Sequence, residues 1–273
     1  MTRMTHTIAI ANQKGGVGKT TLTINTAAAL ARSGYRVLLV DLDPQGHATE
    51  GVGMQESYLE DNLTLYDALT TTKQVHTRDL VHSSDHEQFS VIPSSYKMML
   101  AEQTLYMTRN REHKLRSILA QLEGVYDYVL LDCPPNLGNL TDNALNAARQ
   151  VLVPIQAEAT SVRALELLFD QIESVERGLG IEIRVIGVVP NLVQDSAMAK
   201  RIIGDLRGSI PTLTPFELRK RVLLQNAWEK GRSIFTYSPT NSGDERTQAE
   251  IIHMYTQLAD FVVGQMEGAT PRA

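Results

Sequence analysis

The stretch best suited to chemistry is residues 14–21, KGGVGKTT, in which lysines, glycines and threonines follow one another. An apolar run at residues 7–11 precedes it, and a stretch with helical periodicity at residues 19–32 follows it. A glycine loop between a strand and a helix lets backbone N–H groups face an anion, and the helix start adds partial positive charge. The pattern predicts a loop that binds the phosphates of a nucleotide. Its residues are Gly15, Gly16, Val17, Gly18, Lys19, Thr20 and Thr21.

Each polar side chain of this loop has its own expected role. Lys19 would neutralise the β- and γ-phosphates, the Thr20 hydroxyl would ligate Mg²⁺, and Thr21 would donate to the α-phosphate. The ordinary pattern G-x-x-x-x-G-K-S/T needs glycine at position 13, which is Gln13 here, and a second lysine, Lys14, precedes the glycines. A glycine-rich turn that only connects strand and helix is the alternative interpretation.

Carboxylates follow two further apolar runs. Asp41 and Asp43 come directly after residues 36–40, and Asp132 follows residues 126–131. The carboxyl ends of parallel strands open onto the ligand crevice, where the Mg²⁺ of a bound nucleotide would lie. We therefore expect these aspartates beside the phosphate loop, with a capped turn as the alternative for DPQG, residues 43–46.

Apolar runs and helix-period stretches alternate along the chain. Strands are expected at residues 7–11, 36–40, 89–92, 126–131, 150–155 and 183–189, and helices at 19–32, 137–148, 161–177 and 197–206. Near-continuous apolar strands that alternate with helices predict an α/β fold, a doubly wound, mostly parallel sheet flanked by helices. Residues 51–107 are less regular, and their boundaries stay open.

Length and composition limit the classes of protein. A chain of 273 residues with 42% hydrophobic residues can bury one large core, so we predict a single domain over residues 1–273 with a frayed tail at 267–273. Cys133 is the single cysteine, so neither an internal disulfide nor a cysteine-held metal cluster is expected. No apolar run reaches the roughly 18 residues needed to span a bilayer, and the N-terminus lacks a signal peptide's apolar core. The expected location is cytoplasmic.

Three motifs resemble those of a known family. KGGVGKTT resembles the deviant Walker A motif of the ParA/MinD ATPases, DLDPQGHAT (residues 41–49) is similar to the family's DxDPQGNAT, and DCPP (residues 132–135) matches its Walker B motif. The overall pattern is most similar to partition ATPases of the ParA and Soj type. The resemblance implies a P-loop NTPase fold, ATP hydrolysis, and ATP and Mg²⁺ as cofactors.

The resemblance also implies roles for individual residues. Lys14 would reach across an ATP-bound homodimer to the phosphates of the partner, so Lys14, Lys19 and Asp43 form the expected catalytic set. Asp43 would position and polarise the attacking water, Asp41 would support the magnesium shell, and Asp132 would hold Mg²⁺ through water. The expected metal-site residues are Thr20, Asp41, Asp43 and Asp132.

Four other residues are placed with less support from the motifs. Asn191 follows the run at residues 183–189 and could bind the adenine edge, as an asparagine does in several relatives, or could simply end the strand in a Pro-Asn turn. Pro215 is a second candidate for the adenine pocket. His47 stands where the family motif has asparagine, and Cys133 is expected to be a small buried neighbour without a chemical role.

Basic residues concentrate in residues 199–232, which we call the basic segment. Eight basic residues oppose three acidic ones there, a local charge of +5 within a chain of net charge −5. ParA relatives bind DNA nonspecifically through basic residues in this region, and phosphate contacts by Lys and Arg would suffice for that. The family stretch NVRLSEAPSHGKPI is matched only loosely, Leu223 stands where many relatives have arginine, and a solvated helix face is the alternative. The DNA-binding candidates are Lys200, Arg201, Arg219, Lys220 and Arg221.

These features predict an ATPase that dimerises with ATP, binds nonspecific DNA and positions a plasmid, a chromosome or a large protein assembly. A ParB-like or cargo-adaptor protein would stimulate hydrolysis, and the protein would be nucleoid-associated. The first expected strand begins at about residue 7, which leaves no room before it for a helix-turn-helix module.

Two alternatives remain. A MinD-like membrane-surface ATPase needs a basic amphipathic helix, but residues 244–266 contain no lysine and a single arginine, Arg246, so we expect this helix to pack on the domain. A metabolic P-loop enzyme of the same fold, such as a dethiobiotin-synthase-like ligase or an iron–sulfur carrier, is the other alternative. The single cysteine argues against the carrier.

Overall fold

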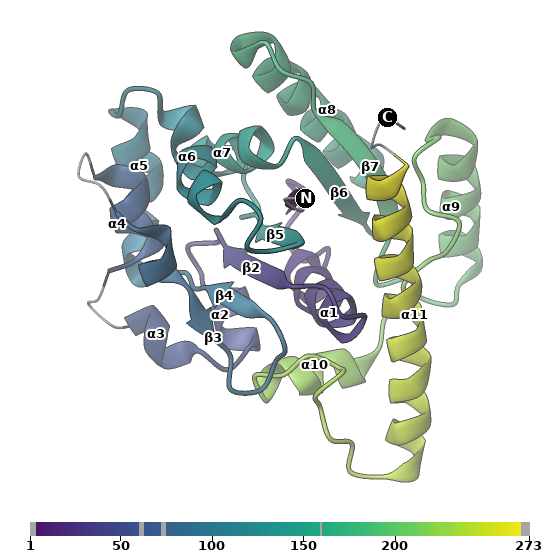
Figure 1. The fold of residues 1–273 in the computed structure, drawn as a ribbon. Coiled ribbons are helices and arrows are strands. Elements are labelled where there is room, and N and C mark those ends of the chain that lie inside the picture. The colour runs from purple at the N-terminus through teal and green to yellow at the C-terminus, as the bar shows by residue number, and fades with distance from the viewer. Residues whose placement is uncertain (1–3, 60–62, 72–74, 159, 269–273) are drawn as a thin grey trace.

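A central sheet organises the structure, a computed structural model that describes residues 4–59, 63–71, 75–158 and 160–268. The strands are β1 (His6–Ile10), β2 (Val37–Asp41), β3 (His82–Ser83), β4 (Ser90–Ile92), β5 (Tyr128–Asp132), β6 (Gln150–Ile155) and β7 (Arg184–Pro190). Among the described residues their order across the sheet is β3-β4-β2-β5-β1-β6-β7, and only β3 and β4 pair antiparallel (Figure 1). The predicted doubly wound, mostly parallel α/β sheet is confirmed.

Helices flank this sheet. They are α1 (Lys19–Arg32), α2 (His47–Gly51), α3 (Gln55–Leu59), α4 (Leu65–Thr70), α5 (Ala101–Tyr106), α6 (Lys114–Leu119), α7 (Asn139–Ala148), α8 (Thr160–Leu179), α9 (Ala197–Ser209), α10 (Val222–Glu229) and α11 (Ser242–Glu267). Short 3₁₀ turns lie at Thr77–Leu80, Tyr96–Leu100, Arg111–His113 and Ala120–Leu122. Within the described residues, no helix is long and apolar enough to cross a membrane.

Two hydrophobic cores form because alternate side chains of each strand point to opposite faces of the sheet. Leu38 and Val40 of β2 belong to the core beneath α4 to α8, whereas Val37 and Leu39 belong to the core beneath α1, α10 and α11. All five residues of β2 and of β5 are buried, as expected for central parallel strands. Both faces of the sheet are therefore covered, and its ligands must approach from a strand end.

The predicted elements agree closely with the observed ones where periodicity is strong. The expected helix at residues 19–32 coincides with α1, and the expected strand at 150–155 coincides with β6. The last helix packs on the domain as predicted, since Tyr255 and Leu258 of α11 are fully buried and α11 lies along α1. It extends to Glu267, the first residue of the predicted tail, and residues 269–273 lie outside the described residues.

The register of the sheet brings three strand ends together. Ile10 of β1 and Asp41 of β2 both pair with Asp132 of β5. The phosphate loop leaves β1 at this level, and the loop that contains Asp43 leaves β2 beside it. Because β1 and β2 lie on the two sides of β5, their following loops meet at one edge of the sheet, which is where a site can form.

Candidate active site

The phosphate loop connects the end of β1 to the start of α1, as the sequence predicts. Its backbone needs glycine, because Gly16 and Gly18 have φ angles of 74° and 80°. A Cβ on Gly18 would lie 2.6 Å from Nδ2 of Asn191, so this position is also too crowded for a side chain. The loop thus presents its main chain at the N-terminus of α1, a geometry suited to binding an anion.

Lys19 and Thr20 lie directly at the strand ends. Lys19 is buried, and burial lowers the pKa of its ammonium while the nearby Asp132 raises it. Thr20 Oγ1 donates to Asp132 Oδ2 at 2.7 Å, and Thr23 Oγ1 donates to Asp132 Oδ1 at 3.0 Å. The hydroxyl at the start of α1 and the carboxylate at the end of β5 therefore touch, across more than a hundred residues of sequence.

Asp41 and Asp132 are fully buried side by side, which makes their charged forms costly. Burial raises the pKa of Asp41 to about 7, with a further rise from Asp132, and raises the pKa of Asp132 to about 6. Asp41 Oδ2 accepts hydrogen bonds from the backbone N and the hydroxyl of Thr49 at 2.8 and 2.7 Å, and Asp41 Oδ1 accepts one from Asp43 N at 3.0 Å. Asp41 thereby fixes the loop that follows it.

Asp43 is the aspartate that faces the cavity. It is 6% exposed, and its Oδ1 accepts a hydrogen bond from the backbone N of Gln45 at 3.0 Å. Its other oxygen lies 3.8 Å from Nδ1 of His47, and the proximity of this carboxylate raises the pKa of the imidazole. The carboxylate is thus held by its own loop and lines the same cavity as the phosphate loop.

A cavity of about 590 Å³ lies over the phosphate loop, a size that fits a nucleotide. Asp43 and His47 line one side, and Trp228 of α10 lies among the residues that close it. The lining residues are Gly15, Gly16, Gly18, Lys19, Thr20, Thr21, Asp43, Gln45, His47, Pro135, Leu192, Lys220, Arg221, Val222, Leu224, Gln225 and Trp228. Most of the predicted phosphate-binding residues therefore face one shared space.

The donor set suits Mg²⁺ better than a protein-only metal cluster. Within the described residues, no group of three or more His, Cys, Asp or Glu side chains could hold a metal ion by itself. The hydroxyl of Thr20 and the carboxylates of Asp132 and Asp43 are hard oxygen ligands at the phosphate loop. Mg²⁺ is usually bound by one or two protein oxygens together with waters and substrate phosphates, so these residues fit it.

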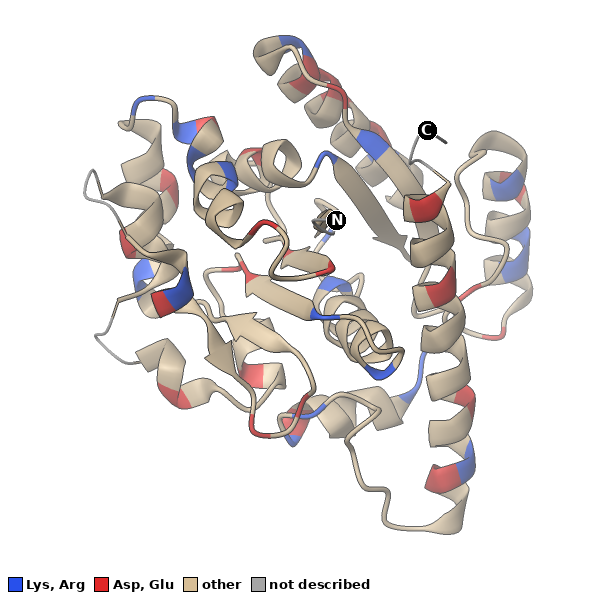
Figure 2. Cartoon of the chain, in the orientation of Figure 1, with Lys and Arg blue, Asp and Glu red and all other residues tan. Residues whose placement is uncertain are grey.

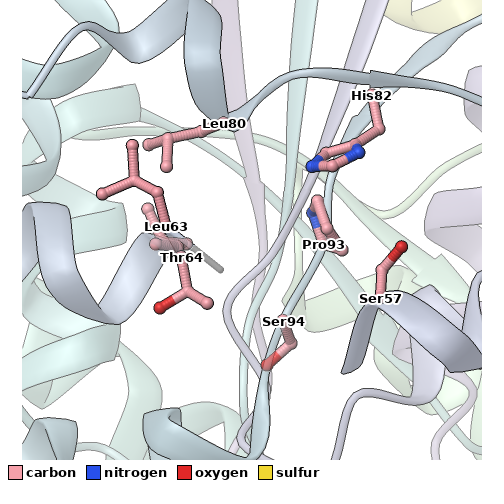
Figure 3. Close-up of a pocket in the computed structure, with 8 residues that line it drawn as sticks. Ser57, Leu63, Thr64, Leu80, His82, Pro93 and Ser94 are labelled. Atoms are coloured by element: carbon pink, nitrogen blue, oxygen red, sulfur yellow. The ribbon is translucent and has the colours of Figure 1, made fainter. Parts of the chain in front are cut away.

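A second, much smaller cavity lies between Ser57, Leu80 and Pro93 (Figure 3). Its volume is about 20 Å³, and Thr64, His82 and Ser94 are among its lining residues. A space of this size holds about one water, so it is no binding site for a nucleotide or a metabolite. Ser94 is buried there, and its hydroxyl donates to the backbone O of Asp43 at 2.7 Å.

The two predicted adenine residues do not line the large cavity. Asn191 is buried, and its Nδ2 donates to the backbone O of Val17 at 2.9 Å and of Gly18 at 3.4 Å. Its amide therefore braces the phosphate loop from behind. Pro215 is exposed and lies outside the lining.

Lys14 turns away from its own phosphate loop. Its Nζ forms an ion pair with Glu158 and donates to Thr160 Oγ1 at 3.0 Å, at the start of α8. Its backbone N binds Asn12 Oδ1 at 2.9 Å, and its side chain stays 24% exposed. The second lysine is thus held at the rim of the site by residues that sequence reasoning missed.

The predicted DNA-binding residues of the basic segment lie in two different environments. Lys200 and Arg201 lie exposed on α9, where Lys200 pairs with Asp195 at 2.6 Å. Figure 2 shows blue Lys and Arg positions on the helix that Figure 1 labels α9. Lys220 and Arg221 line the nucleotide cavity, and Arg221 also pairs with Glu250 of α11 at 3.1 Å. Sequence reasoning missed that α10 closes the cavity.

The phosphate loop and the clustered aspartates define a P-loop nucleotide-binding protein. A family model described as an AAA domain matches residues 5–185. The chromosome partitioning protein ParA of Myxococcus xanthus is 37% identical over 87% of this chain and 83% of that protein. The sporulation initiation inhibitor protein Soj of Bacillus subtilis is 36% identical over 87% of this chain and 93% of that protein. The chain therefore belongs to the ParA and Soj family of P-loop ATPases, and it is an ATPase with ATP and Mg²⁺ as cofactors.

Solved structures show the same architecture. A complex of Cyanothece McdA with ATP has a TM-score of 0.81 at 23% identity, over 96% of this chain and 97% of that one, which is a likeness of fold. A Mycobacterium smegmatis protein named cobyrinic acid a,c-diamide synthase, with bound ADP and magnesium, has a TM-score of 0.73 at 31% identity. It covers 86% of this chain, and its own chain is matched over its full length.

Proposed function

We propose that this protein is an ATPase that forms a homodimer with ATP, binds DNA nonspecifically as that dimer, and positions a cargo over the nucleoid. The cargo is a plasmid, a chromosome or a large protein assembly, and a ParB-like or cargo-adaptor protein stimulates hydrolysis and release. The protein acts in the cytoplasm. Relatives named as chromosome partitioning proteins, and the cell division protein PomZ of Myxococcus xanthus at 34% identity, support this class of function.

The position of Lys14 carries the proposal. A lysine that served its own nucleotide would point into the cavity, as Lys19 does, but Lys14 is absent from the cavity lining and lies at its rim. There its ammonium is partly exposed and held by Glu158 and Thr160. An ammonium at the rim can reach a phosphate in a second subunit once this ion pair opens, and ATP would then join the two subunits.

Within each subunit the remaining residues divide the work of hydrolysis. The backbone of the phosphate loop holds the phosphates, Lys19 balances their charge and Thr21 reaches the α-phosphate. Thr20 and Asp132 hold Mg²⁺, which neutralises charge on the phosphates, while Asp41 supports this arrangement from beneath. The carboxylate of Asp43 accepts a hydrogen bond from the attacking water and orients it. Adenine contacts by Asn191 and Pro215 would require both to move toward the cavity.

The basic segment supports the DNA part of the proposal. Arg201 and Arg219 are exposed, and Lys200 needs only to exchange a surface partner, Asp195, for a phosphate. Lys220 and Arg221 line the nucleotide cavity and so lie where bound nucleotide can affect them. Nonspecific binding through such side chains depends steeply on salt.

DNA binding in defined nucleotide states tests the proposal. Labelled duplexes of unrelated sequence are titrated with the protein in Mg²⁺ and ATP, in Mg²⁺ and ADP, and without nucleotide, at low and high salt. Of these three states, we expect DNA binding only with Mg²⁺ and ATP, and we expect high salt to weaken it. Asp43→Ala should retain this binding although it no longer hydrolyses ATP. Equal binding in every state, or none in any, would contradict the DNA-dependent function.

Two further arms separate the alternatives. Anionic liposomes replace DNA to test a MinD-like membrane activity, and sedimentation with the vesicles only in ATP would favour that activity. The similarity to the protein named cobyrinic acid a,c-diamide synthase makes a metabolic enzyme the second alternative. ATP turnover that depends on a small-molecule acceptor and does not respond to DNA would favour it.

A further inference from the structure

Two departures from the family motifs meet in space. His47 stands in place of the asparagine of DxDPQGNAT, and Trp228 follows Ala227 where the stretch NVRLSEAPSHGKPI has proline. The indole Nε1 of Trp228 donates to the backbone O of His47 at 3.0 Å, and the two rings lie 6.3 Å apart at 60°. These residues are separated by most of the chain, so their contact joins α10 to the loop that carries Asp43.

The indole also packs against α2 without a gap. A Cβ on Gly51 would lie 2.3 Å from Cδ1 and 2.4 Å from Nε1 of Trp228, so the ring rests on the backbone of the helix. In Figure 1, α10 lies next to α2. Trp228 therefore contacts both the first and the last residue of α2.

The opposite side of the loop is held in a similar way. The hydroxyl of Tyr58 donates to the backbone O of Pro44 at 2.9 Å, and its ring lies against Gly46, where a Cβ would be 2.5 Å away. The Ser94 hydroxyl holds the backbone O of Asp43 at 2.7 Å. Contacts from three other segments thus hold residues 43–47, and of the three side chains Trp228 is the one that lines the nucleotide cavity.

We propose that Trp228 is a positioning residue for ATP hydrolysis. Its indole holds the Asp43 loop through the backbone carbonyl of His47, and a movement of this loop is transmitted through the indole to α10. The inference rests on the proposed role of Asp43. Because Lys220 and Arg221 immediately precede α10 and line the same cavity, the indole connects the hydrolysis loop to the basic segment. The rigid indole makes this connection with a single donor and a broad packing face.

Steady-state kinetics of Trp228→Phe test the positioning role. Phenylalanine keeps an aromatic ring on Gly51 but removes the donor to His47. We expect kcat for ATP to fall about three- to tenfold, the range of one neutral hydrogen bond, with little change in KM. Tyr106→Phe is the matched control, since Tyr106 is exposed on α5 and lies outside the cavity lining. An unchanged kcat overturns the proposal, and so does a raised KM with unchanged kcat, because that pattern indicates direct contact with the nucleotide.

Fluorescence of the wild-type protein provides a second test that does not depend on the variant folding. Trp228 is the only tryptophan, so emission excited at its absorption edge comes from this residue alone. We expect different emission with ADP and with a non-hydrolysable ATP analogue, which share adenine and ribose and differ at the γ-phosphate. Identical emission in both states overturns the link between the loop and α10.

The proposed roles of Asp43 and Trp228 can be disproved independently of each other. If Asp43→Ala hydrolyses ATP normally, the proposed role of Asp43 is wrong, whatever Trp228 does. If Asp43→Ala abolishes hydrolysis while Trp228→Phe retains full kcat, the role of Asp43 stands and the positioning role of Trp228 is wrong.

Discussion

The phosphate-loop region and the basic segment differ in how their residues come together. Lys19, Thr20 and Asp132 meet because the neighbouring parallel strands β1 and β5 end at the same edge of the sheet. Lys220 and Trp228 line the same cavity but belong to a segment that comes after β7 and α9 in the chain. The first arrangement follows from strand order, and the second depends on how a later segment packs. In the proposed function, catalysis resides in the first region and its control in the second.

The largest expected effect belongs to the phosphate-loop region. Lys19→Ala removes the buried ammonium at the phosphates, so we expect ATP hydrolysis to fall about 100-fold or more, with nucleotide affinity reduced as well. Hydrolysis is measured by phosphate release and affinity by calorimetry. The exposed Lys230→Ala is the control. Near-normal ATP turnover in Lys19→Ala would show that ATP is hydrolysed at a different site.

The second effect belongs to the rim between the two regions. In Lys14→Ala the charge proposed to act on the partner's nucleotide is lost, so we expect hydrolysis to fall about 100-fold, as for the loss of one electrostatic contact to a transition state, while nucleotide binding to the monomer is retained. Dimerisation with ATP is measured by analytical ultracentrifugation. Glu158→Gln releases Lys14 from its ion pair and should dimerise at lower protein concentration. Wild-type dimerisation and turnover in Lys14→Ala would make this lysine a solvated loop residue.

The same contrast explains what the sequence could predict. The strands, α1 and the aspartates at strand ends follow from apolar runs, helical periodicity and the geometry of parallel sheets, all of which are local or set by topology. The sequence left Asn191 between an adenine contact and a Pro-Asn turn. Neither alternative predicted its hydrogen bonds to Val17 and Gly18, because a strand end fixes position but not the direction of an amide. The irregular residues 51–107 carry short helices with weak periodicity.

Contacts that depend on tertiary packing could not be predicted from the sequence. Glu158 lies in a turn after β6, and nothing in its neighbours indicates that it pairs with Lys14. Trp228, the single tryptophan, was given no role. Lys220 and Arg221 were predicted as DNA-binding candidates, with a solvated helix face as the alternative. A departure from a family motif, such as His47, was the one available signal, and it proved to lie against Trp228.

A smaller effect concerns the pH dependence of stability in the nucleotide-free protein. The pKa of Asp41 is raised to about 7 and that of Asp132 to about 6, so the folded chain holds these protons more tightly than the unfolded chain, where Asp titrates at about 3.9. The stabilisation of the fold by these two bound protons is present below about pH 4 and is lost as the pH rises through about 6 to 7. We expect Tm to fall by several degrees from about pH 5 to 7.5, less steeply in Asp41→Asn. The exposed Asp205→Asn should keep the wild-type slope, and equal slopes in all three proteins would contradict the pKa assignment.

The smallest expected effects lie in the basic segment, where they would separate DNA contacts from nucleotide contacts. Arg201→Ala and Arg219→Ala each remove one exposed charge, so we expect DNA affinity in ATP to fall about two- to fivefold and the salt slope to decrease by about one. Arg78→Ala, exposed at the opposite sheet edge, should bind DNA normally. Lys220→Ala should in addition raise the KM for ATP, because Lys220 lines the nucleotide cavity. If Lys220→Ala changes DNA affinity alone, the basic segment acts as one uniform DNA surface, and the division between its two parts is wrong.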